Sequence, residues 1–116
     1  MVQPPPQPDW DEAAIHSVAQ VLNRRWGLPI IRLLWAEPVR RADLSRQLDG
    51  ISEKVLTVTL RELMARGFVI RHFFEGTPPK VTYRLSEAGY AFGSLLEQIS
   101  AWATNIDSQV TAHRSR

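Results

Sequence analysis

Residues 50–67, GISEKVLTVTLRELMARG, have the pattern of one helix with both of its ends marked. Ser52 is a favourable N-cap, because its hydroxyl can accept a hydrogen bond from a free amide of the first turn. Gly67 suits the left-handed position that follows a last helical turn. The leucines recur at a spacing of i, i+4 and i+7, at Leu56, Leu60 and Leu63. One face of the predicted helix is therefore apolar and packs inward.

The opposite face of this helix, expected over about residues 52–66, carries groups that can meet a nucleic acid. Its side chains are Lys54, Thr57, Val58 and Arg61. Two cations, one hydroxyl and one methyl-bearing side chain can contact phosphates and base edges in a DNA major groove. The alternative is an ordinary solvated face, since charges opposite a leucine stripe are common.

The preceding residues predict a helix-turn-helix. Two helices are expected over about residues 9–23 and between Pro29 and Pro38, the second apolar nearly all round and therefore buried. A short third helix is expected over residues 40–48, followed by a turn at Gly50. A short helix, a tight turn and a helix with a polar outer face form the helix-turn-helix arrangement.

The residues after Gly67 change to a strand pattern. Residues 68–74 and 81–85 are rich in β-branched and aromatic side chains, and a turn-rich loop joins them. We predict a β-hairpin wing over about residues 69–85 with Lys80 near its tip. A basic wing can reach a minor groove or a phosphate. The alternative for Arg71, Lys80 and Arg84 is protection of an edge strand by exposed charge.

A long last helix is predicted after Ser86, which can cap it. Its apolar residues alternate at spacings of three and four, which is a pattern typical of paired helices. We expect part of this stripe to bury against a second copy of the chain, and the alternative is packing against the chain's own first helix. The residues expected at the dimer interface are Ile15, Leu22, Phe92, Leu95, Leu96, Ile99, Trp102, Ala103 and Ile106.

Composition and charge limit the class of protein. The 116 residues include no cysteine, so no disulfide or thiolate metal site is expected. No apolar run approaches ~18 residues, so no membrane span is expected, and a cytoplasmic, nucleoid-associated protein is predicted. Residues 40–84 hold nine Lys or Arg against five acids, which favours a polyanion partner. One domain is expected over residues 9–111, between a Pro-rich disordered tail at 1–8 and a disordered tail at 112–116.

Catalytic and metal-binding motifs are missing from the sequence. We find no Gly-rich phosphate loop, no spaced metal ligands and no nucleophile–base pair, and the three histidines fall in separate predicted elements. The sequence therefore predicts no enzyme activity, no metal and no cofactor.

The chain resembles the HxlR-type family of bacterial winged helix-turn-helix regulators over roughly residues 13 to 103. The residues that carry the resemblance are Arg25-Trp26, Pro38, Arg40, GISEKVLT at 50–57, LREL at 60–63, Gly67, PPKVTY at 78–83, LSEAG at 85–89 and Trp102. The resemblance implies a mainly α fold with a small β-hairpin wing and a long C-terminal dimerisation helix. It also implies a homodimeric DNA-binding transcriptional regulator with dimer contacts from its first and last helices.

Several residues depart from the family pattern. The cysteine that many members carry before the first helix is missing here, so a thiol sensor does not carry over. Val58-Thr59 stands where the family has Gln-Arg, and we expect this loss of an arginine to weaken the grip on phosphate. Arg41 replaces a phenylalanine, and Gly27 and Pro29 are unusual in the second helix.

Two functions from different classes remain open. The first is sequence-specific binding of a pseudo-palindromic double-stranded DNA operator by a homodimer, and the second is a winged-helix module that binds protein without specific DNA binding. The expected DNA-binding residues are Arg40, Arg41, Ser52, Lys54, Thr57, Val58, Arg61, Arg71 and Lys80. A small-molecule effector of unknown identity could bind near Trp26, Trp35 or Trp102, although such aromatics are more often core residues.

Overall fold

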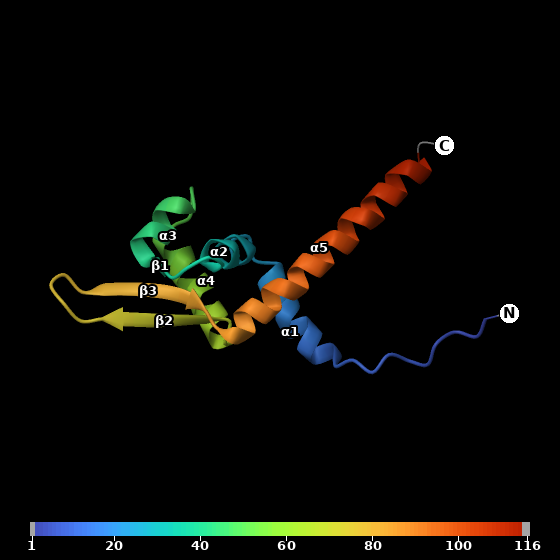
Figure 1. The fold of residues 1–116 in the computed structure, drawn as a ribbon, viewed down its shortest axis with the longest axis horizontal. Helices are drawn as coiled ribbons and strands as arrows, with labels where there is room; N and C mark the ends of the chain where they lie inside the picture. Colours follow the sequence, from blue (N-terminus) through green and yellow to red (C-terminus); the bar gives the residue numbers. More distant parts are fainter. Residues whose placement is uncertain (1, 115–116) are drawn as a thin grey trace.

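The computed structural model describes residues 2–114, with side chains described to residue 111. Its elements are α1 (Glu12–Leu22), α2 (Gly27–Leu34), β1 (Val39–Arg40), α3 (Arg41–Gln47), α4 (Glu53–Ala65), β2 (Val69–Phe74), β3 (Lys80–Leu85) and α5 (Glu87–Arg114). The predicted winged helix-turn-helix with a long last helix is therefore confirmed. The β2–β3 hairpin projects from one end of the helical body and the far part of α5 from the other (Figure 1).

The sheet has three antiparallel strands in the order β1-β3-β2, one strand more than predicted. In β1, Val39 pairs with Tyr83 and Arg40 pairs with Thr82. Two residues after a proline have no strand pattern of their own, so only their pairing with β3 identifies them as a strand. The hairpin itself matches the prediction, because β2 and β3 pair along their whole length from Val69–Leu85 to Phe74–Lys80.

The core lies where α2, α3 and α4 meet the inner face of the sheet. Its fully buried side chains are Ile30, Leu34, Leu44, Leu56, Leu60, Leu63 and Leu85. Each such side chain contributes about 1.5–3 kcal/mol through burial. The prediction that the leucines of the fourth helix face inward is confirmed. The prediction that the second helix is buried nearly all round holds for one face only, because Ile30, Ile31 and Leu34 are buried whereas Leu28 is 40% exposed.

The ends of α2 differ from the prediction. The helix begins at Gly27, where a break was expected, and a Cβ at this position would lie 2.9 Å from the Val21 carbonyl oxygen. A glycine therefore lets the start of α2 approach the end of α1. The helix ends at Leu34, well before Pro38, and the next residue, Trp35, turns its ring onto Tyr90 of α5 with the centroids 5.1 Å apart.

The last helix is anchored at its start. Ser86 Oγ accepts a hydrogen bond from the Gly89 amide at 3.0 Å and donates one to the Gly67 carbonyl, so the predicted cap also joins α5 to the end of α4.

The helix α5 continues to Arg114 and overlaps the tail expected at 112–116, of which residues 115–116 lie outside the described residues. At the other end, residues 2–10 form neither helix nor strand.

Within residues 2–114, no helix is both long enough and apolar enough to span a membrane.

Candidate nucleic-acid interface

The α4 helix presents most of its predicted outer face to solvent. Ser52 caps the helix, because its Oγ accepts from the Val55 amide at 3.1 Å. Lys54 and Arg61 are exposed, and Val58 is 41% exposed. Thr57 is half-buried. Three of the four side chains expected on this face are therefore open, and no ion pair joins Lys54 or Arg61 to an acid among the described side chains.

A polar network partly covers Thr57. The Arg41 guanidinium donates to Thr57 Oγ1 at 2.7 Å and to Glu53 Oε2 at 3.2 Å. Ser45 Oγ donates to the other carboxylate oxygen of Glu53 at 2.6 Å. The hydrogen bond from Ser45 and the adjacent Arg41 hold the pKa of Glu53 below its ordinary value. The sequence offered no signal for this network, since its members come from two helices and none lies in a spacing motif.

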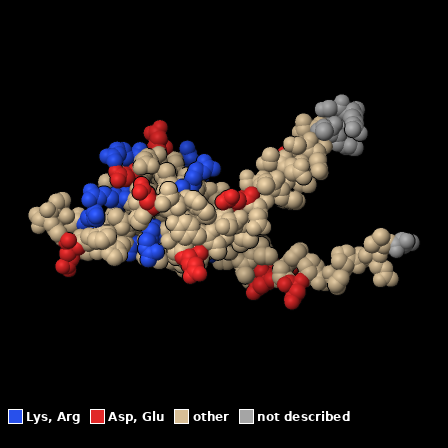
Figure 2. All heavy atoms as spheres, in the orientation of Figure 1, with Lys and Arg blue, Asp and Glu red and all other residues tan. Residues whose placement is uncertain are grey.

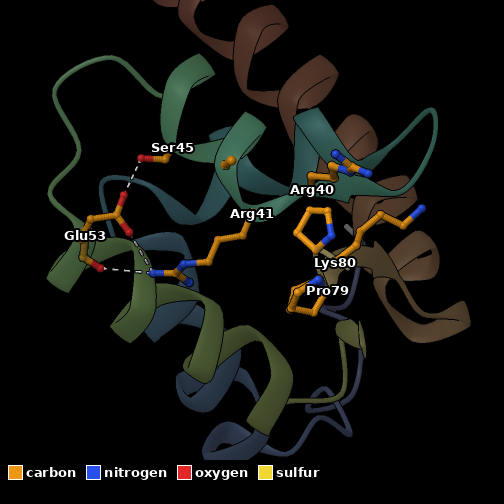
Figure 3. Close-up of a pocket in the computed structure, with 9 residues that line it drawn as sticks. Arg40, Arg41, Ser45, Glu53, Pro79 and Lys80 are labelled. Atoms are coloured by element: carbon orange, nitrogen blue, oxygen red, sulfur yellow. Dashed lines mark hydrogen bonds and ion pairs between the residues drawn. The ribbon is translucent and has the colours of Figure 1, made fainter. Parts of the chain in front are cut away.

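A shallow groove of about 470 Å³ separates this network from the wing. Its lining residues include Arg40 and Arg41, together with Pro79 and Lys80 from the wing. Figure 3 shows the Arg40 and Lys80 side chains pointing away from Arg41, which extends toward Glu53. The Lys80 ammonium lies 4.5 Å from the centroid of the Phe74 ring, which supports it at the wing tip. Arg40 and Lys80 thus form one cationic edge beside the groove.

Arg71 lies on a different face of the wing. It pairs in register with Tyr83, so the two side chains share one face of the sheet. Lys80 lies three positions before Tyr83 in β3 and therefore points to the opposite face. Both basic residues are on the wing as predicted, but they do not form one patch.

Position 59 faces the protein interior. Thr59 is 5% exposed, and its hydroxyl donates to the Val55 carbonyl at 2.8 Å. Position 59 therefore lies on the inner side of α4, away from Lys54 and Arg61, and the expected effect of the missing arginine on phosphate binding stays a prediction.

The far side of α4 is tied to α1 and to the connection that follows α1. Arg24 forms an ion pair with Glu62 at 2.5 Å, and Arg66 donates to Gln20 Oε1 at 2.8 Å and to Ser17. Arg66 therefore holds the two helices together and does not turn back to the free carbonyls of its own helix.

Figure 2 shows the Lys and Arg side chains gathered over the winged part of the molecule, with none on the visible far part of α5.

The apolar stripe on α1 and α5 divides into exposed and buried parts. Five of the residues expected at a dimer interface are exposed, namely Ile15 (53%), Leu95 (54%), Ile99 (50%), Trp102 (65%) and Ile106 (36%). Ala103 is half-buried, and Leu22 and Leu96 pack against the core of the chain. Phe92 is a correction: it is 7% exposed and stacks on Phe68 with ring centroids 4.5 Å apart, so it belongs to the chain's own core.

The three tryptophans considered for an effector lie in different surroundings. Trp26 packs against the core with the Arg25 guanidinium 4.8 Å from its ring. Trp35 contacts Tyr90, and Trp102 is largely exposed on α5. The described residues bring together no group of three or more histidines, cysteines or acids that could hold a metal ion.

Comparison with known proteins agrees with this architecture. The family model for the HxlR-like helix-turn-helix matches residues 21–111. An uncharacterized HTH-type transcriptional regulator of Bacillus subtilis, YtcD, is 34% identical over 92 residues, which are 79% of this chain and 73% of that protein. The HTH-type transcriptional regulator YodB of the same organism is 34% identical over 89 residues, which are 77% of this chain and 80% of that protein.

A solved structure of a MarR-family transcriptional regulator from Enterococcus faecalis V583 is also similar. It has a TM-score of 0.79 and 31% sequence identity, and the match covers 90% of this chain and 96% of the other. These relatives are transcriptional regulators and not enzymes. With its exposed α4 face and its wing, this chain belongs to the HxlR-like helix-turn-helix family of DNA-binding transcriptional regulators.

Proposed function

We propose that the chain acts on the chromosome as a homodimer that binds a pseudo-palindromic duplex site. The observation that carries the proposal is that one chain has two exposed surfaces, one toward each of its ends. The first is the outer face of α4, with Lys54, Val58 and Arg61 exposed. The second is the apolar stripe of α5, with Trp102 at 65% exposure.

The α5 stripe supports self-association. A 28-residue helix is about 42 Å long, and its far part projects from the body of the chain in Figure 1. Ile99, Trp102 and Ile106 lie on this part at spacings of three and four. Exposed apolar residues in a continuous stripe mark an interaction surface. A second copy supplies the matching stripe, since a two-fold interface uses the same patch on both partners.

The α4 face supports insertion into a major groove. Lys54 and Arg61 would contact phosphates or guanine, and Thr57 and Val58 would contact base edges or a thymine methyl. Ser52 and the free amides at the start of α4 would hold a phosphate. Arg40 and Lys80 would flank the site from the groove beside the wing, with Arg71 on the other face of the hairpin. In a two-fold dimer the two helices would read half-sites about one helical turn apart.

The test removes charge from the outer face of α4. A duplex selected from a random pool by the wild-type protein serves as the probe, and affinity is measured over a series of salt concentrations. Lys54→Ala with Arg61→Ala should weaken binding and flatten the log–log salt slope by about 0.9 for each phosphate that is no longer neutralised. Arg24→Ala with Arg32→Ala removes the same charge from the connection between α1 and α2 and from α2 itself, and should leave the slope nearly unchanged. Equal effects of the two pairs would exclude α4 as the DNA-contacting face.

A further inference from the structure

The contacts of Arg41 separate it from the other cations near α4. Arg40 and Lys80 point away from the network and make no ion pair among the described side chains. Arg41 instead donates to Thr57 Oγ1 at 2.7 Å and to Glu53, and its side chain is 30% exposed. A cation in these contacts is already neutralised before DNA arrives.

We propose that Arg41 is a positioning residue for Thr57, and that Glu53 holds it there and away from the DNA backbone. Arg41 would then contribute to discrimination between bases and not to the affinity for non-specific DNA. The inference rests on the proposed function, and it replaces the expectation that Arg41 contacts DNA directly.

The hydroxyl of Thr57 gives the first step. A threonine hydroxyl has one hydrogen to donate and two lone pairs to accept with. Because the Arg41 guanidinium occupies one lone pair, the hydroxyl hydrogen of Thr57 must point elsewhere and can be donated to an acceptor on a base edge. Arg41 thus restricts the rotation of the hydroxyl that sits at the centre of the outer face of α4.

The carboxylate of Glu53 gives the second step. One of its oxygens accepts from Ser45 Oγ at 2.6 Å and the other from Arg41 at 3.2 Å, so the carboxylate is held between α3 and the first turn of α4. The Arg41 guanidinium also lies 3.5 Å from the Glu53 carbonyl oxygen. A planar guanidinium can make these several contacts together, whereas a lysine ammonium is a point charge on a flexible stem.

The two substitutions should differ in their effect on the salt slope of non-specific binding and agree in their effect on base discrimination. A guanidinium paired with Glu53 releases no counterion when DNA binds, so Arg41→Ala should leave the non-specific salt slope unchanged. Removal of the Glu53 charge frees Arg41 for a phosphate, so Glu53→Gln should steepen that slope by about 0.9 for each Arg41 released. Both changes should lower the ratio of specific to non-specific affinity, by on the order of tenfold for one misplaced base contact.

The experiment is a double-mutant cycle of Glu53→Gln and Arg41→Ala in the full chain. Affinity is measured on the duplex selected by the wild-type protein and on a random-sequence duplex, each over a salt series. Glu62→Gln is the matched control, because it removes the same charge from the same helix on the side that faces α1. Arg41→Lys is the conservative variant, and it should keep the charge but fail to restore discrimination. Circular dichroism confirms that each variant is folded.

The expected result is a steeper slope in Glu53→Gln that disappears when Arg41 is also alanine. If Glu53→Gln steepened the salt slope equally with Arg41 and with alanine at position 41, Glu53 would act only by repelling the DNA backbone. That result would overturn the positioning role of Arg41. A flatter slope in Arg41→Ala alone would show that Arg41 is an ordinary phosphate contact and would overturn the inference while leaving the proposed function in place. Failure of the wild-type protein to bind either duplex would instead overturn the proposed function.

Discussion

The indole of Trp35 lies against Gly93 of α5 so closely that a Cβ on the glycine would fall 2.2 Å from ring carbon Cζ3. Tyr90, one turn earlier, completes the contact, because its hydroxyl donates to the Trp35 carbonyl at 3.2 Å and its ring meets the indole edge-on. These contacts join the end of α2 to α5. They connect the winged body of the chain to the helix that we propose for dimerisation.

Replacement of Gly93 by alanine should destabilise the protein despite the better helix propensity of alanine. Alanine in place of a helical glycine normally stabilises by about 0.5–1 kcal/mol. Displacement of the Trp35 ring should reverse that sign and cost about 1–3 kcal/mol, measured by urea unfolding. In a Trp35→Ala background the same substitution should become neutral or stabilising. Destabilisation that persists without the indole would show that this contact is not the cause.

Replacement of Gly89 by alanine should cost more than replacement of Gly93. The Cβ would lie 2.2 Å from the Phe68 carbonyl oxygen, which is a backbone atom and cannot rotate aside. The start of α5 would have to move away from the end of α4, and the cost is expected to exceed about 3 kcal/mol. Chemical denaturation of the two variants side by side measures the difference. A smaller destabilisation at position 89 than at position 93 would contradict this expectation.

Stability should depend on pH through Glu53. Its pKa is lowered from an ordinary value of 4.5 by the hydrogen bond from Ser45 and then by Arg41. A depressed pKa contributes stability that is fully present above 4.5 and is lost as the pH falls through the lower value in the folded protein. The stability difference between wild type and Glu53→Gln should therefore be constant near neutral pH and shrink in acid. A difference that grows on acidification would have the wrong sign.

Dimerisation should depend on the exposed aromatic of α5. Because Trp102 is 65% exposed in the single chain, Trp102→Ala should leave the fold of the chain intact. It should weaken self-association at least about tenfold, since buried tryptophans dominate many interfaces. Sedimentation velocity over a concentration series measures the change. Phe73→Ala, at a residue that is 50% exposed on the wing, is the matched control and should leave the association unchanged.

Local signals explain what could be predicted about the fold. The bounds of α4 could be predicted because Ser52 as N-cap and Gly67 after the last turn act only on the neighbouring backbone. Gly67 has the expected positive φ of 77°. The β1 strand could not be predicted, because Val39 and Arg40 become a strand only through pairing with β3.

Non-local contacts explain what was missed at the sites. A 3–4 repeat does not distinguish a residue that faces a partner from one that faces the chain's own core, and Phe92 proved to be the latter. Likewise, Arg41 has the same sequence signal as any exposed cation in the first turn of a helix. Its pairing with Glu53 and Thr57 depends on the crossing of α3 and α4, which no spacing in the sequence encodes.

The most direct test of the two-fold DNA-binding dimer is hydroxyl-radical footprinting on the duplex selected by the wild-type protein, compared with Lys54→Ala plus Arg61→Ala. We expect two protected half-sites with centres about 10–10.5 base pairs apart or at a multiple of this spacing, both absent with the variant. A single protected patch, or a footprint that the variant reproduces in full, would contradict a dimer that reads DNA through α4.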